Sequence, residues 1–426
     1  MTAMTAWRRV FVWAVFAALV MACGAAAAAG SARHHAHGHH AKPRHHGKPG
    51  HHRHKPKRPP TFVPPGKKVF HGVSDTRVGL PDVKRFQRQV QSHPAVLEDF
   101  YHWDTPVTTG ALHRWKKSRS RGVLSLSTAP GGKSELISPR KMALGYGDQY
   151  IAHLAQSIAK SKQVVYIRLM PEMNGSWNPY CAYNANGTTK GINHSTQSFR
   201  QAWRRFAIVM RGGKVKSINR QLLKLKMPRL LRTKSNALKP YRKAGIGKRV
   251  QRPRVALIWS PQTIGSPNRA GNSARAYWPG SKYVDWVGAD IYSKFASPGI
   301  RAALSRFYSQ YKKFPFVIGE YSPWNNDRSG SFVRWLFKWA RQHGRTRMLI
   351  YYRSVIEGST FDISHYPGAE KALRHELNSK RFMQYPPGTK KHHHHHHHRH
   401  AHDRRPSGVA ARNLARPSAS ERLTLV

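Results

Sequence analysis

Acidic residues are scarce in this sequence. The chain has 426 residues, with 74 Lys and Arg against 18 Asp and Glu, and its formal net charge is +56 at pH 7. Such an excess excludes the near-neutral surface of a typical cytosolic enzyme. Hydrophobic residues still make up 39% of the chain and aromatic residues 11%, so a sizeable core is possible and a wholly disordered chain is excluded.

Cysteine is almost absent as well. Only Cys23 and Cys181 occur, which excludes a disulfide scaffold, and Cys181 is expected to be free. No Gly-x-Gly-x-x-Gly or Walker pattern follows any apolar run, so a nucleotide-binding doubly wound sheet is the weaker alternative and no cofactor is expected. No recognised nucleic-acid motif accompanies the basic residues, and nucleic acid therefore ranks low as a partner.

The first thirty residues have the pattern of a secretory signal peptide. Arg8 and Arg9 precede an apolar run over residues 10–22, and a string of small residues follows. That run is shorter than the ~20 residues that a membrane span needs, so no transmembrane span is expected in the mature form. Two interpretations stay open at its end: cleavage in residues 25–30, which we favour, and lipidation at Cys23. Either one predicts a secreted protein or a protein of the cell envelope.

Histidine is concentrated in two segments of biased composition. Residues 31–60 hold ten of the 28 His, and residues 390–402 hold nine more, including the run His392–His398. Little in such segments can be buried. We predict a disordered linker over residues 31–66 and a disordered tail over residues 386–426.

Three interpretations of these histidines stay open. They are part of a solvated linker, or they form a charge reserve that fills as pH falls through ~6.5, or they bind metal weakly. In the last case the ligands are His392, His393, His394 and neighbouring tail histidines. No metal site is expected in the body between the tails.

Short apolar runs alternate with longer stretches of helical period between the tails. Eight runs rich in β-branched and aromatic residues can be counted: Val69–Ser74, Val96–Trp103, Gly122–Ser127, Val164–Leu169, Val255–Trp259, Val284–Asp290, Phe314–Glu320 and Met348–Arg353. Helical stretches between them include residues 150–160, 196–210, 299–312 and 330–343. Eight strands with intervening helices are the number that closes a barrel. We therefore predict one α/β domain over residues 67–385, a (β/α)8 TIM barrel.

A basic stretch interrupts the even spacing. Residues 212–252 lie between the fourth and fifth predicted strands, and they carry many Lys and Arg and no acid. No Asp or Glu occurs anywhere from Met173 to Tyr283. We predict a basic insertion with an amphipathic piece at Ile218–Leu231. It is either a solvated loop or a site for an anionic polymer.

Several of the few acids fall where predicted strands end. Glu172 follows the fourth strand, Asp290 ends the sixth and Glu320 ends the seventh. The carboxyl ends of barrel strands form the active-site face, so these carboxylates are expected to converge on one bowl. Two carboxylates on facing strands can flank a glycosidic bond, one as nucleophile and the other as acid/base. Asp75 and Asp104, which also end strands, are assigned no role.

The surroundings of the two glutamates resemble family 26 of the glycoside hydrolases, which is best known for endo-β-1,4-mannanases. The family motif Arg-x-x-His-Glu-Met-Asn-Gly-x-Trp is matched at Arg168, Glu172, Met173, Asn174, Gly175 and Trp177. The family's nucleophile follows strand seven, where Glu320 stands. Further family-like segments occur in order at residues 199–204, 259–261, 278–285 and 288–292.

The resemblance implies a retaining glycosidase that cleaves a β-linked polysaccharide by double displacement, with mannan as the first guess. Glu172 is the expected acid/base and Glu320 the expected nucleophile. The two roles need different protonation states, so the pKa of Glu172 should be the higher one and Glu320 should stay ionised. The expected substrate-binding residues are Arg168, Asn174, Trp177, Asp290, Tyr292 and Trp324.

Two departures from the family pattern leave the substrate open. Pro171 stands where the family has a histidine, so one side-chain hydrogen bond in the sugar-binding centre is missing. Tyr351 and Tyr352 stand where mannanases usually have a tryptophan platform. The alternative function is a barrel with little or no catalysis whose cationic surface binds anionic cell-wall or capsular polysaccharide.

Overall fold

The computed structural model describes residues 60–74, 80–107, 110–130, 134–230, 246–325, 327–353 and 361–389. The predicted signal peptide with Cys23, the linker before residue 60, Asp75, and the tail from residue 390 with His392, His393 and His394 lie outside the described residues. In the described ranges, no helix is both long enough and apolar enough to cross a membrane.

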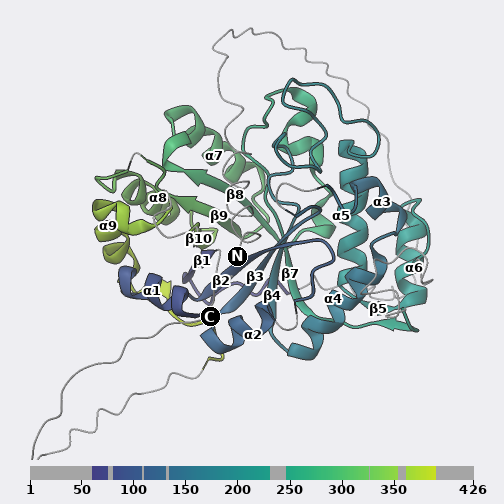
Figure 1. Cartoon of the computed structure of the whole chain (residues 1–426), viewed down its shortest axis with the longest axis horizontal. Helices are drawn as coiled ribbons and strands as arrows, with labels where there is room; N and C mark the ends of the chain where they lie inside the picture. The colour runs from purple at the N-terminus through teal and green to yellow at the C-terminus, as the bar shows by residue number, and fades with distance from the viewer. Residues whose placement is uncertain are drawn as a thin grey trace, which may run out of the picture. The chain divides into compact units, whose positions relative to one another are not determined.

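Within the described residues, eight parallel strands close into a barrel (Figure 1). Their order is β10-β9-β8-β7-β4-β3-β2-β1, and β1 pairs back with β10. The strands are β1 (Val69–Ser74), β2 (Val96–His102), β3 (Arg121–Ser127), β4 (Val164–Leu169), β7 (Arg254–Trp259), β8 (Trp286–Tyr292), β9 (Phe316–Ser322) and β10 (Thr346–Tyr351). A two-residue strand, β11 (Phe382–Met383), adds beside β1. The predicted (β/α)8 barrel is confirmed, and each predicted run overlaps one of its strands.

Helices lie outside the barrel strands (Figure 1). They are α1 (Leu80–Val90), α2 (Ala111–Ser118), α3 (Pro139–Leu144), α4 (Asp148–Ser161), α5 (Thr196–Met210), α6 (Val215–Lys224), α7 (Pro298–Gln310), α8 (Ser331–Gln342) and α9 (Pro367–Leu377). Local sequence sets where some of them begin. Ser195 caps α5 by accepting the Ser198 N–H, and Ser297 followed by Pro298 starts α7 in the same way.

Alternation along each strand decides which side chains face the barrel interior. In β4, Val165 and Ile167 belong to the core between the barrel and its helices, whereas Val164 and Tyr166 belong to the cluster inside the barrel. Arg168 is next in the inward row and is fully buried. The apolar interior therefore gives way to charged groups at the carboxyl end of the barrel.

The chain before β1 covers the opposite end of the barrel. The carbonyl oxygen of Thr61 accepts a hydrogen bond from Trp286 Nε1 at 2.7 Å, and that of Phe62 accepts one from Tyr166 Oη at 2.6 Å. Arg121 Nη1 also donates to Phe62 O, at 2.8 Å. Residues 60–66, assigned from the sequence to the linker, thus already pack against the domain. The chain before β1 thus closes the amino end of the barrel interior.

The basic insertion is a folded excursion in its described parts. Its ends pair as a short antiparallel ladder, β5 (Gly213–Lys214) with β6 (Arg249–Val250), and α6 follows β5. Within the amphipathic piece predicted over residues 218–231, the part up to Lys224 belongs to α6. Pro228 disfavours helical backbone at the residue before it, and Lys226 has a positive φ of 56°.

Candidate active site

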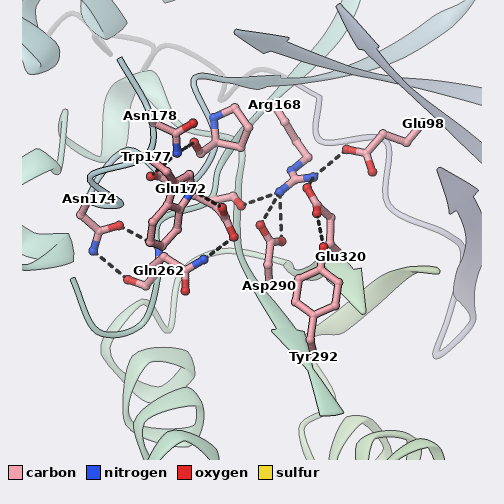
Figure 2. A network of polar contacts seen from close by, with 12 residues as sticks. Glu98, Arg168, Glu172, Asn174, Trp177, Asn178, Gln262, Asp290, Tyr292 and Glu320 are labelled. Atoms are coloured by element: carbon pink, nitrogen blue, oxygen red, sulfur yellow. Dashed lines mark hydrogen bonds and ion pairs between the residues drawn. The ribbon is translucent and has the colours of Figure 1, made fainter. Parts of the chain in front are cut away.

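Arg168 lies at the centre of a buried group of carboxylates (Figure 2). Its Nη1 donates to Glu98 Oε1 at 2.7 Å and to Glu320 Oε1 at 3.0 Å. Its Nη2 donates to both Asp290 oxygens, at 2.7 and 2.9 Å, and to Ser260 Oγ at 3.1 Å. Arg168 and Glu98 are fully buried, and Asp290 and Glu320 are 8% and 9% exposed. Strands β2, β8 and β9 thus each bring one carboxylate to a single guanidinium on β4.

Gly319 makes room for this guanidinium. A Cβ at that position would lie 2.7 Å from Asp290 Oδ1 and 2.8 Å from Arg168 Cζ. Neither group can move without breaking an ion pair in the buried cluster. A glycine is therefore required before Glu320 for steric reasons rather than for backbone conformation.

An irregularity in β9 turns Glu320 toward the arginine. Val317 faces the barrel interior, so strict alternation would place Glu320 on the outer face. The register of β9 shifts against both β8 and β10 at this point, between Ala289 and Ile291 on one side and between Leu349 and Tyr351 on the other. The extra residue brings the Glu320 carboxylate inward and returns Tyr321 to the outer core.

Both oxygens of Glu320 accept hydrogen bonds. Arg168 donates to Oε1, and the hydroxyl of Tyr292, the last residue of β8, donates to Oε2. Two donors on different strands fix the orientation of this carboxylate within the bowl.

Glu172 lies on the tight turn that follows β4. Met170 and Glu172 have positive φ values of 45° and 51°, and the Glu172 N–H donates to Ser260 O at 2.7 Å. Its side chain accepts two hydrogen bonds, from Trp177 Nε1 at 3.1 Å and from Gln262 Nε2. Such backbone strain in non-glycine residues is concentrated at functional sites, where the surrounding contacts maintain it.

Asn174 holds the backbone of Gln262, which donates to Glu172. It is fully buried, its Nδ2 donates to Gln262 O at 3.0 Å, and its Oδ1 accepts the Gln262 N–H at 2.8 Å. Gly175 leaves space for the neighbouring indole, because a Cβ there would lie 2.4 Å from Trp177 Cζ2. Asn174 and Gly175 thus position the two side chains that donate to Glu172.

Burial raises the pKa of the Glu172 carboxyl well above its usual range. The negative charges of Asp290 and Glu320 add to this effect, and Arg168 and the Trp177 N–H oppose it. Burial also raises the pKa of Asp290 to about 7 and that of Glu98 to about 8, in both cases against the opposing charge of Arg168. The direction for Glu172 is the one expected of a general acid, and the bowl retains protons near neutral pH.

Trp324 packs within an aromatic group beside the carboxylates. It is 8% exposed, its ring meets Tyr292 edge-on at 5.4 Å and Phe361 at 4.9 Å, and Lys294 Nζ lies 5.3 Å from its centroid. Tyr352 joins the same group, 5.9 Å from Tyr292. Trp324 thus contacts the site through Tyr292.

Pro171 brings no side-chain hydrogen bond to the bowl. Its carbonyl oxygen instead accepts from Tyr180 Oη at 2.7 Å and from Asn178 Nδ2 at 3.4 Å. These contacts hold the turn that carries Glu172, in the place where the resemblance led us to expect a histidine.

The structure brings most of the predicted residues together. Arg168, Asp290, Tyr292 and Glu320 contact one another directly, and Trp177 contacts Glu172. Sequence reasoning missed three contributors: Glu98, Ser260 and Gln262. The sequence does contain an indication of Glu98, because an acid within the apolar run of β2 is unusual. Asp99 stands next to it, however, so the sequence does not indicate which of the two acids faces the barrel interior. Within the described ranges, no group of three or more His, Cys, Asp or Glu has a metal-binding arrangement.

The closed barrel and the carboxylates at its carboxyl end define a (β/α)8-barrel protein with a buried acidic site on its active-site face. Solved structures similar to it include three mannanases. They are a Bacillus subtilis mannanase (15% identity, 71% of this chain and 84% of that chain covered, TM-score 0.43), a family 26 β-mannanase from Bacteroides ovatus (15%, 78% and 95%, 0.47) and a double mutant of a Cellulomonas fimi endo-β-1,4-mannanase (13%, 74% and 72%, 0.48).

One of these structures, the β-mannanase from Bacteroides ovatus, belongs to family 26, the family that the sequence motifs resemble. At such identities and TM-scores the likenesses describe the fold alone. No family model and no curated protein matches the chain.

Proposed function

We propose that the protein is a retaining glycoside hydrolase of β-linked polysaccharide, with endo-β-1,4-mannanase-like action. The observation that carries this proposal is a pair of glutamates in opposite settings on one bowl. Glu172 has a raised pKa and can supply a proton, whereas Glu320 accepts hydrogen bonds from Arg168 and Tyr292. Retaining glycosidases need one carboxyl group of each kind.

In the first step, Glu172 protonates the leaving glycosidic oxygen while a Glu320 oxygen attacks the anomeric carbon. The C–O bond to the leaving sugar breaks, and a covalent glycosyl-enzyme ester forms. In the second step, the Glu172 carboxylate takes a proton from water, and the resulting hydroxide attacks the same carbon. The ester bond breaks, Glu320 leaves as a carboxylate, and two inversions give net retention.

The electrostatics of the bowl support the change in the role of Glu172 between the two steps. The negative charge of Glu320 is one of the causes that raise the pKa of Glu172. Ester formation removes that charge, so the pKa of Glu172 falls in the intermediate. Glu172 is thereby favoured as an acid before the ester forms and as a base afterwards.

The proposals for the substrate and for the place of action rest on features of the sequence. The resemblance to family 26 makes mannan the first glycan to test, and the signal-peptide pattern over residues 1–30 supports action outside the cytoplasm. The missing histidine at Pro171 makes other β-linked glycans the second choice.

The test is reducing-sugar release from mannan, glucomannan, mixed-linkage glucan, xylan and an acidic exopolysaccharide. We expect the Glu172→Gln variant to lose roughly 10²- to 10⁴-fold in rate, and the Glu320→Gln variant to lose more because no covalent intermediate can form. A matched control is Glu370→Gln, which removes a carboxylate that pairs with Arg374 on α9. Its rate should stay near that of the wild type.

The stereochemistry of the first-formed product provides an independent check. Proton NMR should detect the β-anomer before mutarotation, because two inversions retain the configuration. An initial α-anomer would exclude the role of Glu320 as nucleophile. Release from no glycan by folded wild-type protein would overturn the proposal altogether.

A further inference from the structure

An open, shallow surface depression lies at the end of α7, apart from the carboxylates. It consists of two adjoining hollows of about 430 and 240 Å³, which share Lys312, Lys313 and Phe314. We call this surface the basic groove and define it by Arg275, Trp278, Lys312, Lys313, Arg345 and Arg347. Its residues come from the β7–β8 connection, the segment between α7 and β9, and the start of β10.

The basic groove carries charge of one sign. Among the described residues that line the two hollows there are five cations and no carboxylate. Arg345 Nη1 donates to Tyr311 O at 3.1 Å and to Phe314 O at 2.9 Å, and Arg347 Nε donates to Lys68 O at 2.9 Å. Since main-chain carbonyls are neutral, these bonds orient the guanidinium groups without cancelling their charge.

The cations of the basic groove differ in their burial. Burial lowers the pKa of Arg347, and the nearby charge of Arg381 lowers it further. Arg275, Lys312 and Lys313 are exposed, so an anion can approach them from solvent. The groove therefore favours a negatively charged ligand.

An aromatic ring lies among these cations. Trp278 is half-buried, and its ring centroid lies 4.8 Å from those of Trp259 and Tyr311 and 5.6 Å from that of Phe314. The packing fixes the indole and leaves part of it facing the larger hollow. A rigid apolar ring beside exposed cations suits a ligand that has both an apolar face and negative charges, as a pyranose bearing a carboxylate does.

The basic groove is separate from the proposed catalytic bowl. Pro315 lines the groove just before β9 begins, and Glu320 lies near the end of the same strand. Five residues of extended chain separate them by roughly 16 Å. A ligand in the groove is thus not a ligand of the Glu172 and Glu320 pair.

We propose that the basic groove binds an anionic polysaccharide with carboxylate groups, and that it holds the protein on a matrix while the bowl remains free. The choice of a glycan over another polyanion rests on the proposed function, since a secreted glycosidase meets such matrices. The binding itself needs no turnover, so it can be tested whether or not the bowl hydrolyses any glycan.

The first experiment maps the contact on the unaltered full chain. Lysines are acetylated in the presence and absence of a uronic-acid oligosaccharide, and mass spectrometry reports the modification of each lysine. Lys116 and Lys117 serve as the internal control, because they are an adjacent exposed pair in the last turn of α2. We expect protection of Lys312 and Lys313 and none of the control pair. Equal protection of both pairs, or of neither, would overturn the proposal.

The second experiment compares two double variants with the same change in charge. The Lys312→Glu/Lys313→Glu variant should bind the oligosaccharide roughly tenfold more weakly than wild type at low salt, and the difference should shrink as salt is added. The Lys116→Glu/Lys117→Glu variant should bind like the wild type. Equal weakening in both variants would point to diffuse attraction and count against a defined groove.

Two further probes separate the possible ligands. A neutral mannan oligosaccharide should leave Lys312 and Lys313 unprotected, because it offers no charge. A single-stranded oligonucleotide of equal charge should protect them less than the uronic-acid oligosaccharide does. Protection by the oligonucleotide that equals or exceeds it would refute the choice of a polysaccharide.

Discussion

The bowl and the basic groove, which lie on the same barrel, differ in the sign and in the burial of their charges. The bowl gathers four of the 18 acids of the chain, Glu98, Glu172, Asp290 and Glu320, around one buried arginine. The groove gathers five cations with no carboxylate among its described lining residues. This strongly basic chain thus concentrates several of its few acids around one buried guanidinium.

The comparison indicates that the burial of a charged group, and not the net charge of the chain, sets its pKa and the strength of its interactions in this protein. In the bowl, low polarity strengthens each interaction and raises the pKa values of Glu98, Glu172 and Asp290. In the groove, exposed charges are screened by salt and act on ligands from solution. A given substitution should therefore have a large effect in the bowl and a small one in the groove.

The largest expected contrast comes from removing one arginine from each region. Arg168→Met should destabilise the protein by about 3–5 kcal/mol, because it leaves three buried carboxylates without their shared counter-charge. Arg275→Met, at an exposed position in the groove, should change stability by no more than about 0.5 kcal/mol. Urea unfolding of both variants measures the difference. Equal costs would mean that the bowl charges are as well hydrated as those of the groove.

A tyrosine in each region sharpens the contrast for activity. Tyr292→Phe removes the hydroxyl that donates to Glu320, and we expect kcat to fall roughly 10- to 100-fold with the fold unchanged. Tyr311→Phe removes a hydroxyl beside the groove and should leave kcat unaltered. Steady-state kinetics on the glycan that the wild type cleaves provide the measurement. An unchanged kcat for Tyr292→Phe would contradict the role given to this hydrogen bond.

The smallest expected effect is a dependence of stability on pH. Burial raises the pKa of Glu98 from 4.5 to about 8, so the folded state binds more protons than the unfolded state between those values. The free energy of unfolding of the wild type should therefore fall as pH rises through this window. Glu98→Gln keeps an oxygen that can accept from Arg168 but cannot titrate. Its stability relative to wild type should rise by about 1 kcal/mol or more from pH 4.5 to 8.

Lys312→Gln is the matched control for this pH series. No carboxylate lines the described groove, so the stability difference between this variant and the wild type should be flat across the same window. Thermal unfolding at four or five pH values is sufficient. A flat difference for Glu98→Gln as well would show that Glu98 is ionised in the folded protein throughout.

Most strands of the barrel could be predicted from the local pattern of apolar residues. The eight apolar runs, bounded by turns and separated by stretches of helical period, predicted strands that the structure bears out within a few residues. Arg168 was also readable as an inward residue, because it continues the period-two row of Val164 and Tyr166. The amphipathic piece predicted in the insertion is helical as far as Lys224, and the helix is followed by the positive φ of Lys226 and by Pro228.

The site shows where local pattern stops being sufficient. Glu98 contacts Arg168 from 70 residues away in the sequence, and Gln262 contacts Glu172 from 90 residues away. Such long-range contacts cannot be predicted from the neighbouring residues. A sequence of alternating residues also does not reveal a register shift, because the shift arises from pairing with two neighbouring strands.

The sequence by itself determined that eight strands would form and that Glu172, Arg168 and Asp290 would stand at their carboxyl ends, because strand periodicity and length are local properties. Tertiary structure decided that Glu320 faces the bowl. The irregularity that turns it inward exists only where β9 pairs with β8 and β10, and the space for the arginine exists only because Gly319 lies against Asp290.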